Sequence, residues 1–282
     1  MAEKKKKTAS KKTKASKKTS AKSAGIPVYN SDGEVKGHIE LPPVFSTPIR
    51  EDLIHRAVVA AEANRRQPYG ADPMAGKRYS VEWPGKGRGM ARTPRIRGGT
   101  GMARFAPNAV GGRRAFPPKP EKDYSKKVNR KERRLARFSA IAATAVVERV
   151  LARGHRFDEK LSLPIVVDSS VEEIKSASEA VAFLEKIGVG DDIRRAKEGR
   201  HIRAGRGKMR GRKYRQPRSL LFVIAPDEDG GTRHKALGFR NLPGVDVVSV
   251  QRLGTHHLAP GGMPGRLTMF SEKAMEIMRG WK

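Results

Sequence analysis

Apolar residues along this chain fall into short runs of consecutive residues and into longer stretches with helical spacing. The runs "LPIVVD" (163–168), "SLLFVIAP" (219–226), "VDVVSV" (245–250) and "RLTMF" (266–270) predict strands, and "SLLFVIAP" in particular has the composition of a buried strand. Helix-like stretches lie between them at 171–188 and 232–242, and another follows at 272–280. Strands that alternate with helices predict an α/β fold, a three-layer domain with a mainly parallel central sheet.

The first part of the chain adds elements of a different kind. "IPVYNSDGEVKGHIEL" (26–41) predicts two short strands joined by a turn at 30–33. A helix is expected over 47–67, with Thr47 as its N-cap and Pro48 at its first position.

Helix-capping signals set the remaining helix boundaries that the sequence predicts. A helix over 128–154 is expected to begin with a capping box between Asn129 and Glu132 and to end at Gly154. Ser170 with Glu173 is expected to cap the helix over 171–188, and Ser271 is expected to cap the last helix.

Residues 64–119 break every periodic pattern. They contain ten glycines and seven prolines, so neither a helix nor a central strand can extend far. This composition predicts a long irregular loop that extends from the domain. The expected organisation is therefore a globular body of residues 26–63 and 120–282, an extended basic Gly/Arg/Pro loop of residues 64–119, and a disordered Lys-rich tail of residues 1–25.

Positive charge is concentrated in three segments of the chain. The formal net charge is +31; residues 1–25 contribute +9, residues 64–119 contribute +11 and residues 194–218 contribute +11. The remaining residues hold 25 basic and 25 acidic side chains, so the expected body is neutral. Because a uniform bias would spread evenly, this concentration indicates a polyanionic partner.

Signals for other classes of protein are missing from the sequence. The chain has no cysteine, no apolar run long enough to span a membrane and no secretory signal. The glycines near 85–101 lack the flanking strand and helix of a dinucleotide site, and no P-loop is present. The seven histidines lack metal-ligand spacing, His256 and His257 are expected to point apart, and Asp191 and Asp192 are expected to cap a helix. We therefore expect no enzyme activity, metal, cofactor, small-molecule substrate or membrane contact.

Arginine and glycine together suit contacts to RNA. Guanidinium groups bind phosphates at two points, and glycine lets the backbone approach closely. We expect a segment of this kind to take its shape from the RNA it threads through. The candidate RNA-binding residues are Lys86, Arg88, Arg92, Arg95, Arg97, Arg104, Arg113, Arg114, Arg206, Lys208, Arg210, Arg212, Lys213, Arg215 and Arg218.

Four further arginines lie at the expected start of the helix over 128–154. They oppose the helix dipole, which favours anions at this end. This misfit suggests phosphate contacts, although solvated arginines explain it nearly as well. The four are Arg130, Arg133, Arg134 and Arg137.

Three interpretations are consistent with these features. The first is a structural protein that binds folded RNA, and the second is a free basic nucleic-acid-binding or regulatory RNA-binding protein. The third is an α/β enzyme with basic loops, for which no nucleophile beside a base is visible in the sequence.

Longer motifs sharpen this choice. The chain resembles the universal family of the fourth protein of the large ribosomal subunit, in its archaeal form. The Lys-rich residues 1–25 depart from the family pattern, and the long C-terminal extension of eukaryotic members is not found. The matching motifs are "LPPVFSTPIREDLIHRAVVAAEANRRQPYG", "GKGRGMARTPRIRGG", "RRAFPPKPEKDYSKKVNRKERRLARFSAIAAT", "GRKYRQPRSLLFVIA" and "LAPGGMPGRLTMFSEKAM".

The resemblance implies a cytoplasmic protein of the ribosome, with large-subunit rRNA and neighbouring large-subunit ribosomal proteins as partners. It implies a globular domain on the outer face of the subunit and a long loop that threads into the rRNA. In this family the tip of the loop helps to narrow the polypeptide exit tunnel. The matching tip residues here are Lys86, Gly87, Arg88, Gly89, Met90, Ala91 and Arg92.

Overall fold

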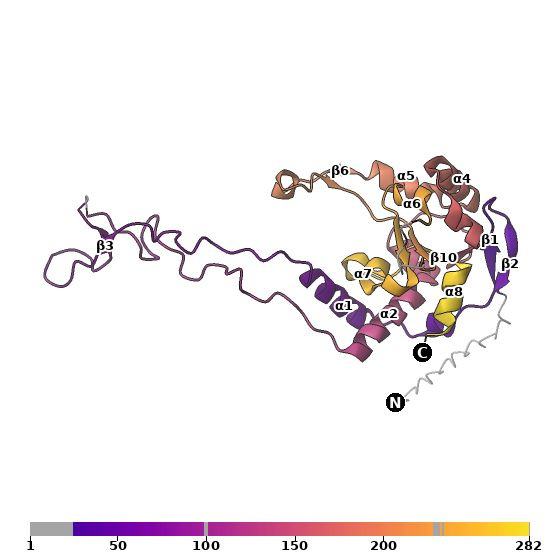
Figure 1. The fold of residues 1–282 in the computed structure, drawn as a ribbon, viewed down its shortest axis with the longest axis horizontal. Helices are drawn as coiled ribbons and strands as arrows, with labels where there is room; N and C mark the ends of the chain where they lie inside the picture. Colours follow the sequence, from indigo (N-terminus) through magenta and orange to yellow (C-terminus); the bar gives the residue numbers. More distant parts are fainter. Residues whose placement is uncertain (1–24, 99–100, 228–231, 233, 282) are drawn as a thin grey trace, which may run out of the picture.

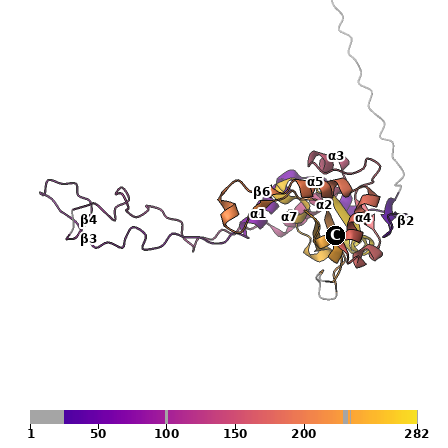
Figure 2. The ribbon, with the colours of Figure 1, turned by 90° about the horizontal axis from the view of Figure 1, so that it is seen from above.

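A body of helices and strands carries a long narrow extension in the computed structural model (Figure 1). The structure describes residues 25–98, 101–227, 232 and 234–281, so the predicted disordered tail lies outside the described residues except for Gly25. The extension, residues 64–129, is called the arm below. Figure 2 shows the arm leaving the body on the same side as in Figure 1.

The body is built around one sheet. Its strands in the described part of the chain follow the order β2-β1-β5-β10-β8-β9, in which only the β1–β2 pair is antiparallel. The predicted α/β class with a mainly parallel sheet is therefore confirmed. The strands are β1 (Ile26–Tyr29), β2 (Val35–Ile39), β5 (Ile165–Val167), β8 (Leu221–Ile224), β9 (Asp246–Ser249) and β10 (Thr268–Ser271).

Alternation along the strands creates two cores, one on each face of the sheet. Successive side chains of a strand point to opposite faces, so neighbours in β8 belong to different clusters. Phe222 packs with Phe183 of α4 (Ala177–Ile187) and Phe239 of α6 (Leu237–Arg240), whereas Val223 lies in the cluster on the other face. The continuous apolar runs of the sequence thus reflect strands that are covered on both faces.

Helices cover both faces of the sheet and give the predicted layers (Figures 1 and 2). α4, α5 and α6 contribute residues to the cluster that contains Phe222. α1, α2, α7 and α8 contribute residues to the cluster that contains Val223. The helices are α1 (Glu51–Ala63), α2 (Arg130–Thr144), α3 (Val147–Ala152), α4 (Ala177–Ile187), α5 (Gly190–Glu198), α6 (Leu237–Arg240), α7 (Thr255–Leu258) and α8 (Glu272–Arg279).

Two predicted helix starts are wrong. Thr47 does not cap α1: it directly follows the 3₁₀ helix Pro43–Ser46, and α1 begins only at Glu51 after Arg50. Ser170 lies in a 3₁₀ helix, Ser169–Glu173, and α4 begins separately after Ser176.

The predicted helix over 128–154 is divided into two. Asn129 precedes α2 as expected, but its side chain makes no capping hydrogen bond. The chain is extended at Val146, where α3 begins, and Gly154 adopts a positive φ of 88° just after α3 ends. The boundary at Gly154 is confirmed, whereas the capping box and the continuous helix are wrong.

The predicted cap of the last helix is confirmed. Ser271 Oγ accepts a hydrogen bond from the backbone N–H of Ala274 at 3.3 Å, and the serine is buried at the end of β10. This bond satisfies one of the backbone donors that every helix start leaves free.

We expect Ser271→Ala to lower the free energy of unfolding by about 1 kcal/mol, because the first turn of α8 loses its acceptor. Urea unfolding monitored by circular dichroism measures the change. Ser31→Ala, in the exposed turn after β1, is the matched control and should leave the midpoint in place. Equal midpoints for the two variants would contradict the capping role.

Candidate nucleic-acid interface

The arm consists of an outgoing and a returning stretch of chain between the end of α1 and the start of α2. Its outgoing and returning halves are held together by sparse hydrogen bonds, such as the one from Ala71 N–H to the carbonyl of Pro118 at 2.9 Å. Near the outer end, β3 (Val81–Glu82) pairs with β4 (Arg95–Ile96) in antiparallel register. The arm therefore has a defined path but buries little surface of its own.

Glycine is required where the two halves of the arm touch. Gly76 has a φ of 74°, and a Cβ built on it would lie 2.5 Å from the backbone of Gly112 and Arg113. At the tip the requirement is different: Gly87 has a φ of 79° with open space around it. A side chain at Gly87 would strain the backbone without a clash, because L-residues rarely adopt this conformation.

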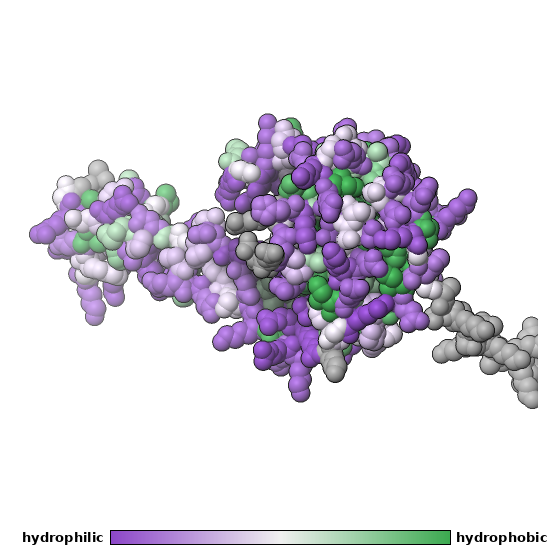
Figure 3. Space-filling view, turned by 45° about the vertical axis from the view of Figure 1, so that its right-hand side comes forward, coloured by the Kyte–Doolittle hydropathy of each residue, from purple (hydrophilic) through white to green (hydrophobic). Residues whose placement is uncertain are grey.

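The predicted tip residues lie on an exposed surface of the arm. The side chains of Lys86, Arg88 and Arg92 make no hydrogen bond or ion pair with any residue that the structure describes. Their charges are therefore free for an external anion. Figure 3 shows apolar side chains among hydrophilic ones at this end of the molecule, and Trp83 and Met90 are both exposed here.

Two of the predicted RNA-binding arginines also bond within the arm. Arg95 donates from Nη1 to the carbonyl of Gly101 at 2.5 Å, and Arg104 donates to the carbonyl of Val110. The guanidinium of Arg104 also lies over the ring of Tyr79, 5.5 Å from its centre. Both arginines are partly buried, so they shape the end of the arm before any partner arrives.

The other predicted arm residues differ in exposure. Arg97 and Arg114 are exposed, whereas Arg113 is partly buried and its guanidinium lies 3.4 Å from the carbonyl of Arg114. Phe116 follows them with 98% of its surface exposed. An exposed aromatic beside arginines has the chemistry for stacking on an unpaired base.

A second basic extension projects from the body on the same side as the arm (Figures 1 and 2). This basic hairpin, residues 199–218, pairs β6 (His201–Ile202) with β7 (Tyr214–Arg215). The ring of Tyr214 lies under the guanidinium of Arg200 at 4.3 Å. Six of the seven predicted hairpin residues are exposed without an ion pair in the described chain: Arg206, Lys208, Arg210, Arg212, Lys213 and Arg215.

The seventh hairpin residue is already paired with a carboxylate of the body. Arg218 Nη1 lies 2.7 Å and 2.9 Å from the two carboxylate oxygens of Asp246. Asp246 also pairs at 2.8 Å with Arg266, whose side chain is fully buried and donates to the carbonyls of Ser219 and Leu220. These bonds fix the end of the hairpin to the sheet.

A buried carboxylate joins the same end of the hairpin to α5. Asp192, in the first turn of α5, accepts hydrogen bonds from Ser219 Oγ at 2.6 Å and Arg195 Nε at 2.9 Å. His155 Nδ1 lies 3.1 Å from the same carboxylate. The expected capping role of Asp192 is wrong, because no side chain caps α5 and this one points into the body.

The pKa values in this cluster follow from burial and hydrogen bonding. Burial alone would raise the pKa of Asp192, but the bonds from His155, Ser219 and Arg195 outweigh it and hold the pKa at about 2. Burial lowers the pKa of His155 despite the nearby carboxylate. The cluster therefore contains an ionised Asp192 and a neutral His155 at pH 7.

The two adjacent histidines do not point apart as expected. The ring centres of His256 and His257 are 3.8 Å apart, because both lie in the single turn of α7. Burial, followed by the neighbouring His256, lowers the pKa of His257 to about 4. In the described residues no group of three or more histidines and carboxylates could hold a metal, and no helix is long and apolar enough to cross a membrane.

Comparison with known proteins gives the family. The sequence profile of the ribosomal protein L4/L1 family matches residues 39–281. The chain is 50% identical over 256 residues to "Large ribosomal subunit protein uL4" of Methanopyrus kandleri, covering 89% of this chain and 96% of that protein. Proteins of the same name from Thermoplasma acidophilum (49% identical, 90% and 97% covered) and Haloquadratum walsbyi (51% identical, 88% and 96% covered) are similarly close.

The chain belongs to the ribosomal protein L4/L1 family. The resemblance inferred from the sequence motifs is thereby confirmed, together with the archaeal character of its relatives. Membership of the L4/L1 family makes the chain a structural protein of the cytoplasmic ribosome and not an enzyme. The profile covers the arm and the part of the body from residue 39 onward.

Residues that root the hairpin were missed by the reasoning from sequence. Asp192 and Arg266 are charged, and charged side chains are seldom fully buried. No spacing rule connects Asp192 to His155 or Ser219, since they come from separate elements. The apolar run that follows Ser219 was the one sequence feature that indicated an attachment of the hairpin to the sheet.

We expect Asp192→Asn to lower the free energy of unfolding at pH 7 by about 3 kcal/mol, because Arg195 and the other donors lose a buried charged partner. A carboxylate with a lowered folded-state pKa stabilises the protein above its unfolded pKa of about 4, and this stability is lost as the pH falls towards 2. The variant should therefore show a weaker pH dependence between 4 and 2 in urea unfolding.

The neighbouring Asp191 provides the control. Its carboxylate is exposed and pairs with Arg194 at 3.3 Å on the surface, so Asp191→Asn should cost less than about 1 kcal/mol. Similar losses for both variants, or an unchanged acid transition for Asp192→Asn, would show that the buried cluster does not stabilise the fold.

Proposed function

We propose that this chain is a structural constituent of the large ribosomal subunit that binds large-subunit rRNA through the arm and the basic hairpin. The arm tip, residues 86–92, reaches the polypeptide exit tunnel. In this proposal residues 26–63 and 120–282 form the body, residues 64–119 form the RNA-binding loop, and residues 1–25 form a basic tail.

The observation that carries the proposal is the separation of paired and unpaired charge. In the body, buried charges such as Asp192 and Arg266 have partners. At the tip and in the hairpin, exposed cations such as Arg88 and Arg210 have none among the described residues. Because exposed cations without counter-charges repel one another, a polyanion is the partner that stabilises them.

The shape of the arm favours folded RNA over duplex DNA. The arm is narrow, leaves the body as a long extension and holds its halves together with few hydrogen bonds (Figure 1). Such a segment can thread between RNA helices, where phosphates line both sides of its path. A free DNA-binding protein has no need of this extension. Neighbouring ribosomal proteins are further partners in this proposal.

We expect Arg88→Gln/Arg92→Gln to weaken binding of the full chain to a large-subunit rRNA transcript. The slope of log K against log salt should fall by roughly 0.7–0.9 for each phosphate that the variant no longer neutralises. Filter binding at several salt concentrations measures this slope. The control Lys175→Gln/Lys186→Gln removes the same charge from exposed positions in and beside α4.

Equal slopes for the arm variant and the control would show that only total charge matters. Duplex DNA that competes as well as rRNA would favour the free nucleic-acid-binding alternative. Arg95→Gln/Arg104→Gln separates shape from charge, because these side chains bond within the arm. This variant should also increase hydrogen exchange of arm amides in the free protein.

The tunnel position of the tip has its own test. The chain has no cysteine, so Met90→Cys gives a single labelling site at the tip. In ribosomes that carry a stalled nascent chain, a photo-crosslinker on this residue should join the nascent chain. The same label on Ala182→Cys, an exposed position on α4, should not. Cross-links from position 90 to rRNA alone would remove the tunnel role and leave rRNA binding intact.

A further inference from the structure

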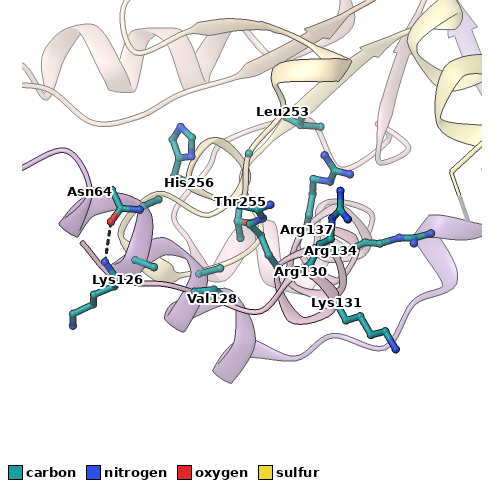
Figure 4. Close-up of a pocket in the computed structure, with 15 residues that line it drawn as sticks. Asn64, Lys126, Val128, Arg130, Lys131, Arg134, Arg137, Leu253, Thr255 and His256 are labelled. Carbon is teal, nitrogen blue, oxygen red and sulfur yellow. Dashed lines mark hydrogen bonds between the residues drawn. The ribbon is translucent and has the colours of Figure 1, made fainter. Parts of the chain in front are cut away.

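A groove lies where the arm joins the body. It has a volume of about 770 Å³ and lies between α1, α2 and α7 (Figure 4). Its lining includes both roots of the arm, Asn64 and Lys126, which are joined by a hydrogen bond from Lys126 N–H to Asn64 Oδ1 at 2.9 Å. Anything bound in the groove would therefore contact both halves of the arm at their origin.

One wall of the groove is strongly basic. The first turns of α2 present Arg130, Arg133, Arg134 and Arg137 to it. None of these four guanidinium groups forms an ion pair or hydrogen bond within the part of the chain that the structure describes. The acidic residue of these turns, Glu132, pairs instead with Arg56 at 3.3 Å and does not line the groove.

Arg137 shows that this wall is built and not merely solvated. Its guanidinium lies over the ring of Trp281, 4.4 Å from the ring centre, and this contact fixes the guanidinium beside the residues that follow α8. Its Nε is buried without a hydrogen-bond partner. Burial, followed by the charges of Arg134 and Arg133, lowers the pKa of Arg137, so the cations crowd one another without an anion between them.

The opposite side of the groove is formed by α7 and the residues before it. Figure 4 shows His256 across the groove from the arginines of α2. Burial, followed by the charge of Arg65, lowers the pKa of His256, so the imidazole is neutral at pH 7. No carboxylate is among the described residues that line the groove. This set of side chains therefore suits an anion and offers no ligand for a metal cation that would accompany it.

We propose that this groove binds backbone phosphates of large-subunit rRNA and that the bound strand fixes the direction in which the arm leaves the body. The choice of RNA rests on the function proposed above. Arg130 and Arg137 are separated by about 10 Å along the helix axis. This distance is longer than a single phosphate group, so the arginines match successive phosphates of a strand. The positive end of the α2 dipole adds to the attraction, so arginines that oppose the dipole gain a common partner.

The test compares three double variants of the full chain in the rRNA binding experiment. Arg130→Gln/Arg134→Gln should weaken binding at least roughly tenfold and lower the salt slope by about 0.7–0.9 for each phosphate left without its arginine. Arg130→Lys/Arg134→Lys keeps the charge and should recover part of the affinity. Lys175→Gln/Lys186→Gln again controls for total charge, and the urea midpoint of each variant confirms that it is folded.

The outcomes distinguish this proposal from the function on which it rests. The groove variant is Arg130→Gln/Arg134→Gln. If it binds rRNA like the control while binding by Arg88→Gln/Arg92→Gln is weakened, the groove proposal is wrong and the arm proposal stands. If neither is weakened, both are wrong. The lowered affinity and slope, with partial recovery by lysine, support the groove.

A crosslink decides what occupies the groove in the assembled subunit. Ala61 lines it and is partly exposed, so Ala61→Cys places a single photo-crosslinker there in a chain without other cysteines. In large subunits we expect crosslinks to rRNA. A crosslink to another ribosomal protein would overturn the proposal. Hydrogen exchange at the Lys126 amide should also slow on RNA binding in the wild type and not in the groove variant.

Discussion

Repulsion between unpaired cations is the constraint on which the rest of this structure depends. Two unit charges roughly 10 Å apart in water repel by only about 0.4 kcal/mol, and salt reduces this further. The arm and the basic hairpin nevertheless hold many such pairs, and packing them against the body would lower the dielectric around them. The chain keeps these cations in solvent on narrow extensions, where an external polyanion can reach them (Figure 1).

Charged side chains at the base of the basic hairpin are buried and paired, in contrast to the exposed, unpaired cations farther out. Asp192 and Arg266 are buried, and each is surrounded by hydrogen-bonding partners, as burial of a charge requires. These clusters join the C-terminal end of the hairpin to α5 and β9. The protein therefore places its buried ion pairs at the base of the hairpin and leaves the outer cations unpaired. A defined root lets a segment with little structure of its own point in one direction.

The sequence predicted the elements that depend on local pattern and missed those that depend on contacts. The strand β8 and the cap at Ser271 follow from apolar runs and a single side chain, and both are present. The start of α1 and the break at Val146 depend on how the chain packs, so pattern alone misplaced them. In the arm, Arg88 and Arg95 look alike in sequence, yet only Arg95 bonds to the arm itself. Such a difference requires the folded path of the backbone.

Two extensions on the same side of one body have a consequence for binding (Figures 1 and 2). Once one extension holds RNA, the other acts at a high effective concentration, because the rigid roots limit where it can go. Each phosphate contact can then be weak and still contribute to a tight complex. The arginines at the start of α2 extend this argument to the body, because a strand held at the root of the arm would reduce the freedom of the arm before its tip finds a partner. Orientation by the body and attachment by the arm are thus two parts of one binding event.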